Sequence, residues 1–225
     1  MTDHELDEAI AHARAQPGTA GLPALEALHE RTQREREPLD PALGRTWDAL
    51  VQVAGREPED LTALYRHAEG RARWLAAARG PGHPETIDAW AELGEAADLE
   101  LAWEIAARAW EAIVAAPSQG LPNAALWSVS RALRGLASIR HRAGQLDAAR
   151  ALFEQDLALN LRLHPGGHAQ LALSHGNLAL LLEEQGEAAR ALAERERQRE
   201  ILAATGASEG QLTAVDGHLA RLRGA

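Results

Sequence analysis

Apolar residues recur at helical spacing along the chain, in two groups that a glycine separates. On each side of Gly144 the apolar positions lie three or four residues apart, which places them on one face of a helix. Glycine tolerates the left-handed conformation that ends many helices, so Gly144 predicts a turn between two helices. The apolar positions are Leu133, Leu136 and Ala137 in the first group, and Ala149 and Phe153 in the second.

This two-helix unit repeats through the chain. A shift of 42 residues forward carries Gly144 to Gly186. Two successive shifts of 43 residues back carry Leu133 to Trp90 and then to Trp47. Four units align in this way, and a repeat of this length predicts stacked helix pairs.

The spacing predicts four helix pairs, with a further pair before them and a single helix after them. Residues 3–15 and 22–36 form the preceding pair, a candidate degenerate repeat. The last helix begins near Ser208, because Ser208 and Gln211 have the spacing of a capping box. The four pairs between them are 42–54 with 59–79, 84–98 with 101–116, 123–142 with 146–163, and 168–184 with 187–204.

The composition agrees with a helical protein and narrows the range of partners. Ala and Leu dominate the 46 % of hydrophobic residues, and both lose little on entering a helix. The net charge of −10 argues against nucleic acid as a partner, since a phosphate backbone needs a basic surface. No apolar run approaches the roughly 20 residues that span a bilayer, and no secretory signal is visible. We therefore expect a cytoplasmic protein without a membrane partner.

Four short motifs stand at the predicted helix pairs and their linkers. They are WAELG at residues 90–94, LFEQD at 152–156, GPGHPET at 80–86 and HPGGH at 164–168. WAELG matches the W-x-x-L-G signature of the tetratricopeptide repeat (TPR), and LFEQD resembles its aromatic-bearing second helix. The other two resemble the linkers of kinesin-light-chain-type repeats. The resemblance covers roughly residues 40–204 and implies an all-α fold, an α-α superhelical solenoid of about four TPR-like helix pairs.

The resemblance implies three parts of the chain. Residues 1–38 form an N-terminal helix pair, residues 39–206 hold the four repeats, and residues 207–225 form a C-terminal capping helix. Stacked repeats need terminal caps with a polar outer face, so a single final helix is expected. The repeats are expected at about 40–79, 83–117, 123–163 and 167–204.

The chain departs from the repeat pattern at three places. The second unit reads AADLELAW, residues 96–103, and has no glycine between its helices. The fourth unit reads GEAARAL where the third reads GQLDAARAL, and is two residues shorter. Arg140 stands where an apolar or aromatic packing residue is usual. These departures affect the expected helix boundaries.

The resemblance also points to a candidate binding surface. In this repeat family the first helix of each pair lines the concave surface, and the position within the repeat tells which residues face it. The third unit contributes one polar stripe, made of Arg131, Arg134, Ser138, His141 and Arg142. The fourth unit contributes Leu173, Asn177 and Leu180. The second unit contributes an acidic stripe of Asp88, Glu92, Glu95 and Asp98.

The arginines of this surface favour an acidic partner. A guanidinium group can make two charge-assisted hydrogen bonds to one carboxylate. Arg134 and Asn177 resemble two elements of the carboxylate clamp of some TPR domains, but Ser138 stands where a second Asn is expected. An anion-binding groove is therefore the prediction. The alternative is that the acidic and basic stripes of neighbouring helices pair with each other.

The sequence thus predicts a protein- or peptide-binding scaffold that recognises an acidic and apolar segment in the concave groove. The alternatives are a self-associating structural module, and a small-molecule sensor or accessory enzyme with a pocket inside the superhelix. No catalytic motif is present, so we expect neither an enzyme nor a cofactor. The chain has no Cys, and no Asp completes a metal-ligand spacing for His164, His168 and His175. Capping or packing roles suit these histidines better than a metal site.

Overall fold

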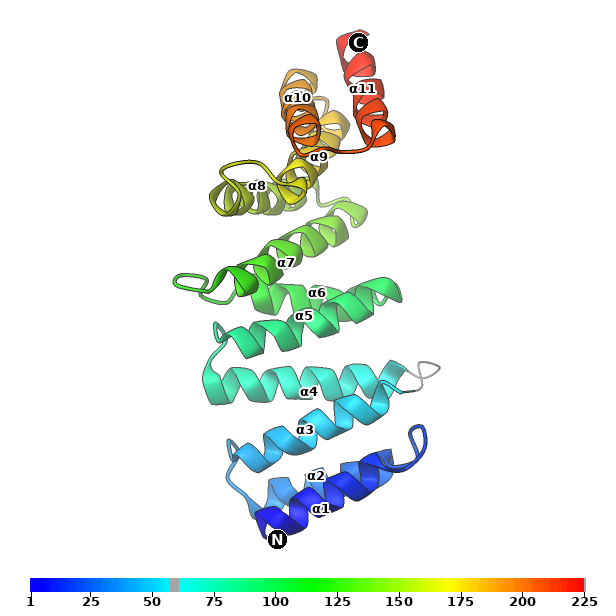
Figure 1. The fold of residues 1–225 in the computed structure, drawn as a ribbon, viewed down its shortest axis with the longest axis vertical. Coiled ribbons are helices and arrows are strands. Elements are labelled where there is room, and N and C mark those ends of the chain that lie inside the picture. The colour runs from blue at the N-terminus through cyan, green and yellow to red at the C-terminus, as the bar shows by residue number, and fades with distance from the viewer. Residues whose placement is uncertain (57–60, 225) are drawn as a thin grey trace. The chain divides into compact units, whose positions relative to one another are not determined.

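The computed structural model describes residues 1–56 and 61–224, and these residues form eleven α-helices and no strand (Figure 1). The all-helical prediction is confirmed. The first seven helices are α1 Asp3–Arg14, α2 Leu22–Glu35, α3 Pro41–Ala54, α4 Leu61–Arg79, α5 Pro84–Leu99, α6 Trp103–Val114 and α7 Asn123–Arg142. The others are α8 Leu146–Leu163, α9 Ala169–Glu184, α10 Ala188–Ala204 and α11 Glu209–Gly224.

The chain divides into two compact units, Met1–Ser128 and Val129–Ala225, with the boundary inside α7. In the first unit each helix from α1 to α6 packs against the next, and in the second the same holds from α8 to α11. This packing of sequence neighbours is that of an α-α solenoid. The division into residues 1–38, 39–206 and 207–225 follows the repeat pattern instead and stays a prediction.

Most predicted helices agree with the structure to within one or two residues. The capping box at the start of α11 is confirmed, because the Ser208 hydroxyl accepts from the N–H of Gln211 at 3.3 Å and the Gln211 side chain accepts from the N–H of Ser208 at 3.0 Å. The first two residues of the predicted helix 59–79 lie outside the described residues. No described helix has the length and apolar character needed to cross a membrane.

The first unit packs around leucines and tryptophans at the repeat positions. Leu6, Leu25 and Leu50 are fully buried between α1, α2 and α3. Trp110 on α6 is also buried, and a Cβ atom at Gly94 on α5 would lie 2.8 Å from its indole ring. The glycine of the WAELG motif therefore lets the two helices of this pair approach each other.

The second unit has its own core. Phe153 of α8 packs against Leu178 and Leu182 of α9 and against Ala191 of α10. Val215 and Leu219 attach α11 to Leu202 on α10. The outward residues of α11 are mostly polar, among them Thr213, Asp216 and Arg221.

Side-chain caps recur at the starts of the first helices of the pairs. The Asp40 carboxylate accepts a hydrogen bond from the N–H of Ala42 at 2.8 Å. At the same repeat position, ring Nδ1 of His83 accepts from the second residue of α5 at 3.3 Å, and ring Nδ1 of His168 accepts from the second residue of α9 at 3.2 Å. Such caps satisfy backbone donors that the helix leaves unpaired. The capping role predicted for His168 is confirmed.

The turn between α5 and α6 is unusual because a leucine occupies a glycine position. Gly144 and Gly186 end α7 and α9 with φ of 73° and 76°, and Leu101 takes the equivalent place with φ of 60°. In these turns the N–H of the next residue donates to a carbonyl oxygen of the preceding helix. Ala102 donates to Ala97 at 2.8 Å, and Gln145 donates to Arg140 at 2.9 Å. The turn geometry is thus retained without glycine, at the cost of a left-handed leucine.

Replacing this leucine is expected to stabilise the protein. Leu101→Gly should raise the free energy of unfolding of the monomer by about 1 kcal/mol, because it removes the left-handed strain and Leu101 is 62 % exposed in the single chain. Chemical denaturation of the variant measures the gain. Leu99→Gly is the matched control: Leu99 is the last residue of α5 and its φ is negative, so glycine relieves no strain there and should not raise stability. Equal effects of the two substitutions would contradict the strain at Leu101.

Candidate binding surface on α7 and α9

The predicted groove residues of the third and fourth repeats all lie in the second unit. The polar stripe lies on α7 after the unit boundary, and Leu173, Asn177 and Leu180 lie on α9. His141 near the end of α7 contacts Glu184 at the end of α9, with 2.6 Å between Nε2 and Oε2. These two helices therefore lie side by side at this point.

Two leucines of α9 are exposed on one face. Leu173 and Leu180 are each 43 % exposed, whereas the other leucines of this helix are buried. They lie seven residues apart, which places them on the same side of the helix. Asn177 lies between them, half-buried, and its amide makes no hydrogen bond to any residue in the described ranges 1–56 and 61–224. This face offers apolar area and one amide to a partner.

A buried polar network centred on Asp156 of α8 connects this helix to α7 and α9. The Asp156 carboxylate is fully buried and accepts from the hydroxyls of Ser130 on α7 and Ser174 on α9, each at 2.6 Å. The Asn160 amide donates to Asp156 Oδ1 at 2.9 Å and also to both serine oxygens. Arg134 adds a cation, with Nη1 2.9 Å from the Ser130 oxygen and 3.5 Å from Asp156 Oδ1. The network joins three consecutive helices.

Burial and pairing act in opposite directions on the two charges. Burial raises the pKa of Asp156, while Arg134 and the hydrogen bonds from Ser130, Ser174 and Asn160 lower it. Burial likewise lowers the pKa of Arg134, and the charge of Asp156 opposes that change. Each ion therefore depends on the other to remain charged in the interior.

Arg134, which was predicted to bind an anionic ligand, also belongs to the buried network around Asp156. Its side chain is only 17 % exposed, and Nη1 is held by Ser130 and Asp156. Nε and Nη2 make no hydrogen bond to another residue of the described ranges, so they stay available as donors. The network fixes the guanidinium group in place, which lowers the entropy that a ligand would lose on binding it.

The rest of the predicted stripe is more accessible. Arg131 and Arg142 are exposed, and both take part in interactions of their own. The Ser138 hydroxyl donates to the Arg134 carbonyl oxygen at 2.9 Å, a bond within its own helix. On α5, in the other unit, Asp88 and Glu92 are exposed, and Glu95 and Asp98 are half-buried. Glu92 lies 3.3 Å from Arg71 of α4, so part of the acidic stripe pairs within its own unit.

A cavity of about 290 Å³ adjoins Leu173. Its walls come from α9, α10 and α11, and Leu202 and Val215 provide apolar surface. Arg195 lies on its lining and is buried, where Nε donates to Glu183 at 2.9 Å and Nη1 to Gln198 at 3.0 Å. The cavity could take one large apolar side chain of a partner.

The histidines considered for a metal site have other contacts. The rings of His164 and His168 stack with their centroids 4.4 Å apart, and Nδ1 of His175 lies 2.6 Å from Glu194. Within residues 1–56 and 61–224, no group of three or more His, Cys, Asp or Glu side chains is placed to hold a metal ion.

The roles of Asp156, Asn160, Ser130 and Ser174 were not predicted from the sequence. A signal was nevertheless present, because Asp156 and Asn160 continue the spacing of Ala149 and Phe153 along α8. Polar residues at core positions of an amphipathic helix indicate a buried network that must be satisfied internally.

Comparisons with known proteins show the fold. No protein-family model matches the chain, and no curated protein matches it. Two structures of nearly identical TPR-like repeats, assigned to a kinesin light chain of Podosopora anserina, are similar at 19 % identity with TM-scores of 0.56 and 0.57. The matches cover 90 % and 91 % of this chain and 95 % and 97 % of those chains. BtubC (BKLC) from P. vanneervenii is similar at 16 % identity and a TM-score of 0.54, over 92 % of this chain and 91 % of that one. The chain therefore has the fold of TPR-like helical repeats, as seen in structures of kinesin light chains.

Proposed function

We propose that this chain is a binding scaffold whose surface on α7 and α9 recognises an acidic and apolar segment of a partner protein. TPR-like repeats are in general protein-interaction scaffolds, since their stacked helices present extended surfaces. The observation that carries the proposal is the pair of exposed leucines on α9, Leu173 and Leu180, beside the cationic stripe of α7. Absence of catalysis and a cytoplasmic location stay predictions from the sequence.

The chemistry of the surface supports a partner of this kind. Leu173 and Leu180 would bury partner side chains, and the cavity beside Leu173 adds apolar surface for one anchor residue. Arg131 and Arg142 would attract carboxylates of the partner and raise the rate of association. The amide of Asn177 can bind the partner's backbone between the two leucines.

The structure changes how the arginines should be tested. Replacing Arg134 would leave the buried Asp156 without its cation, so a loss of binding would be confused with a loss of stability. Arg131→Ala with Arg142→Ala removes charge from the exposed stripe and keeps the network intact. The variant Arg131→Ala with Arg134→Ala would combine the two effects and is therefore the poorer test.

The leucines give the sharper test. Peptides displayed on phage are selected on the immobilised chain, and acidic sequences with apolar residues are expected to be enriched. Leu173→Asp with Leu180→Asp should raise the Kd of a selected peptide at least tenfold, as measured by fluorescence anisotropy, because it removes apolar contacts and adds repulsion.

The matched control is Leu161→Asp. Leu161 is 50 % exposed on α8 and lies outside the proposed surface, so this variant should bind the peptide like the wild type. An unchanged affinity of the folded Leu173→Asp/Leu180→Asp variant would remove this surface from consideration. Enrichment of basic peptides would contradict the proposed partner chemistry.

A further inference from the structure

The corner between α5 and α6 presents two leucines to solvent. Leu99 is 81 % exposed and Leu101 is 62 % exposed, the two highest values among the exposed large hydrophobic residues of the described ranges. Leu101 is also the left-handed residue at a position where the later repeats have glycine. Strain and exposure both disfavour the isolated chain. Such features often mark a functional surface.

A large cleft adjoins this corner in the same unit. It has a volume of about 870 Å³ and follows one face of α4 from Leu61 to Arg73, beside α6. This stretch of α4 is about 18 Å long at the rise of an α-helix. Leu61, Tyr65 and Ile105 give the cleft apolar walls. The leucines of the corner remain exposed, so they do not fill the cleft of their own chain.

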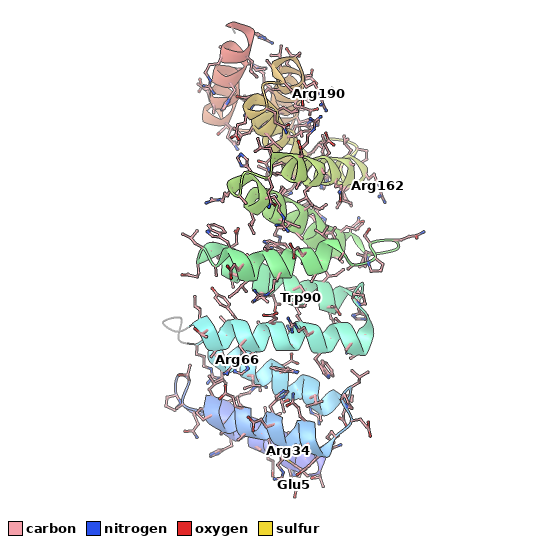
Figure 2. All side chains as sticks on the ribbon, turned by 180° about the vertical axis from the view of Figure 1, so that it is seen from behind. Glu5, Arg34, Arg66, Trp90, Arg162 and Arg190 are labelled. Atoms are coloured by element: carbon pink, nitrogen blue, oxygen red, sulfur yellow. The ribbon has the colours of Figure 1, made fainter. Side chains whose placement is uncertain are left out.

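The lining of the cleft contains three arginines and two glutamates, one of which is Glu100 of the corner. The arginines are Arg66, Arg73 and Arg108, which all have exposed side chains. Glu69 is shared between Arg73 at 2.6 Å and Arg108 at 3.3 Å, so one carboxylate serves two guanidinium groups. Arg66, labelled on α4 in Figure 2, pairs with Glu26 of α2.

The corner has the opposite charge. Glu100 lies between the two leucines, and Asp98 and Glu104 flank them, with no basic residue from 98 to 104. Glu100 also lines one end of the cleft, so the two surfaces adjoin. The corner is therefore an acidic and apolar element that complements the cationic and apolar cleft in charge and in polarity.

We propose that two copies of this chain associate through these surfaces, with the corner of each copy in the cleft of the other. Adjacent complementary surfaces on one subunit permit a two-fold symmetric pair, in which both contacts form at once. Burial of Leu99 and Leu101 in the pair would explain why a leucine is present at a turn position where the later repeats have glycine. This pairing uses the first unit alone and is independent of the partner surface on α7 and α9.

Sedimentation analysis of the full chain, from micromolar to millimolar concentration, tests the pairing. We expect a monomer–dimer equilibrium, and a dimer Kd at least tenfold higher for Leu99→Asp. Leu161→Asp, which changes an equally apolar residue on α8, should leave the equilibrium unchanged. A monomer at every concentration would overturn the proposal, and so would a dimer that tolerates Leu99→Asp.

A charge exchange tests which surfaces meet. Arg73→Glu and Glu100→Arg should each weaken the dimer, because each places like charges opposite one another. Mixing the two variants should restore it, since in the mixed pair one contact is native and the other has both charges reversed. Circular dichroism checks that each variant remains folded. Weakened single variants without restoration in the mixture would show that the corner does not meet the cleft.

Discussion

Replacing Asp156 by alanine is expected to lower the free energy of unfolding by about 3–5 kcal/mol, because a buried ion pair loses one member. The variant would leave the half-buried guanidinium group of Arg134 without its counter-charge. It would also leave the Ser130 hydroxyl without its acceptor, and the Ser174 hydroxyl with only the carbonyl oxygen of Gln170 at 3.1 Å. Asn160 would lose its bond to the carboxylate. These polar groups are buried, and a buried polar group without a hydrogen bond is destabilising.

Chemical denaturation of the wild type and the variant measures this effect. Asp147→Ala is the matched control, since Asp147 is an exposed carboxylate in the first turn of the same helix. Asp147→Ala should lower the free energy of unfolding by less than about 1 kcal/mol, because an exposed acidic residue near a helix N-terminus contributes no more than this. An Asp156→Ala variant as stable as Asp147→Ala would show that the network contributes little to the second unit.

The stability of the first unit is expected to fall as the pH falls from 6.5 towards 4. His29 of α2 is buried, its Nδ1 lies 2.7 Å from the Thr46 hydroxyl oxygen, and its ring centroid lies 4.0 Å from that of Trp47. Burial, with a smaller contribution from the charge of His67, lowers the pKa of His29 from 6.5 to about 4. Its Nε2 is buried and makes no hydrogen bond within the part of the chain that the structure describes.

The direction of this change in stability follows from proton binding. The unfolded chain binds a proton at His29 near pH 6.5, and the folded chain does so only near pH 4. The neutral ring thus supports the fold fully above pH 6.5, and this contribution is lost between pH 6.5 and 4. The difference corresponds to at most about 3 kcal/mol. Burial also lowers the pKa of His67, so a second histidine acts in the same direction.

Denaturation at a series of pH values between about 7.5 and 4 tests this dependence. His29→Gln, which cannot be protonated in this range, should flatten the fall in stability. His12→Gln changes an exposed histidine of α1 and should leave the curve of the wild type unchanged. Equal slopes for wild type and His29→Gln would contradict the lowered pKa of His29.

The fold could be predicted because its pattern is redundant. Trp47 and Trp90 occupy the same position in successive repeats, and Gly144 and Gly186 mark the same turn twice. The residue pattern did not reveal that Leu101 would keep the turn geometry of a glycine. Backbone hydrogen bonds impose that geometry, and the side chain at the turn changes only the free energy of the left-handed conformation.

The candidate surface could be predicted only in part. Helical spacing places Arg134 on the polar side of α7, but it does not give the direction in which a long side chain turns. That direction depends on Asp156, which belongs to the next helix. Exposure of Leu173 and Leu180 follows from the repeat position, whereas the cavity beside Leu173 depends on how α11 packs and has no local signal.

Hydrogen–deuterium exchange with and without a selected acidic and apolar peptide tests the proposed function most directly. We predict slower amide exchange in α9 and in α7 from residue 129 onward, with the exchange of α4 and α6 unchanged. Protection confined to α4 and α6, or to α8 and α10, would place the partner elsewhere and contradict the proposed surface.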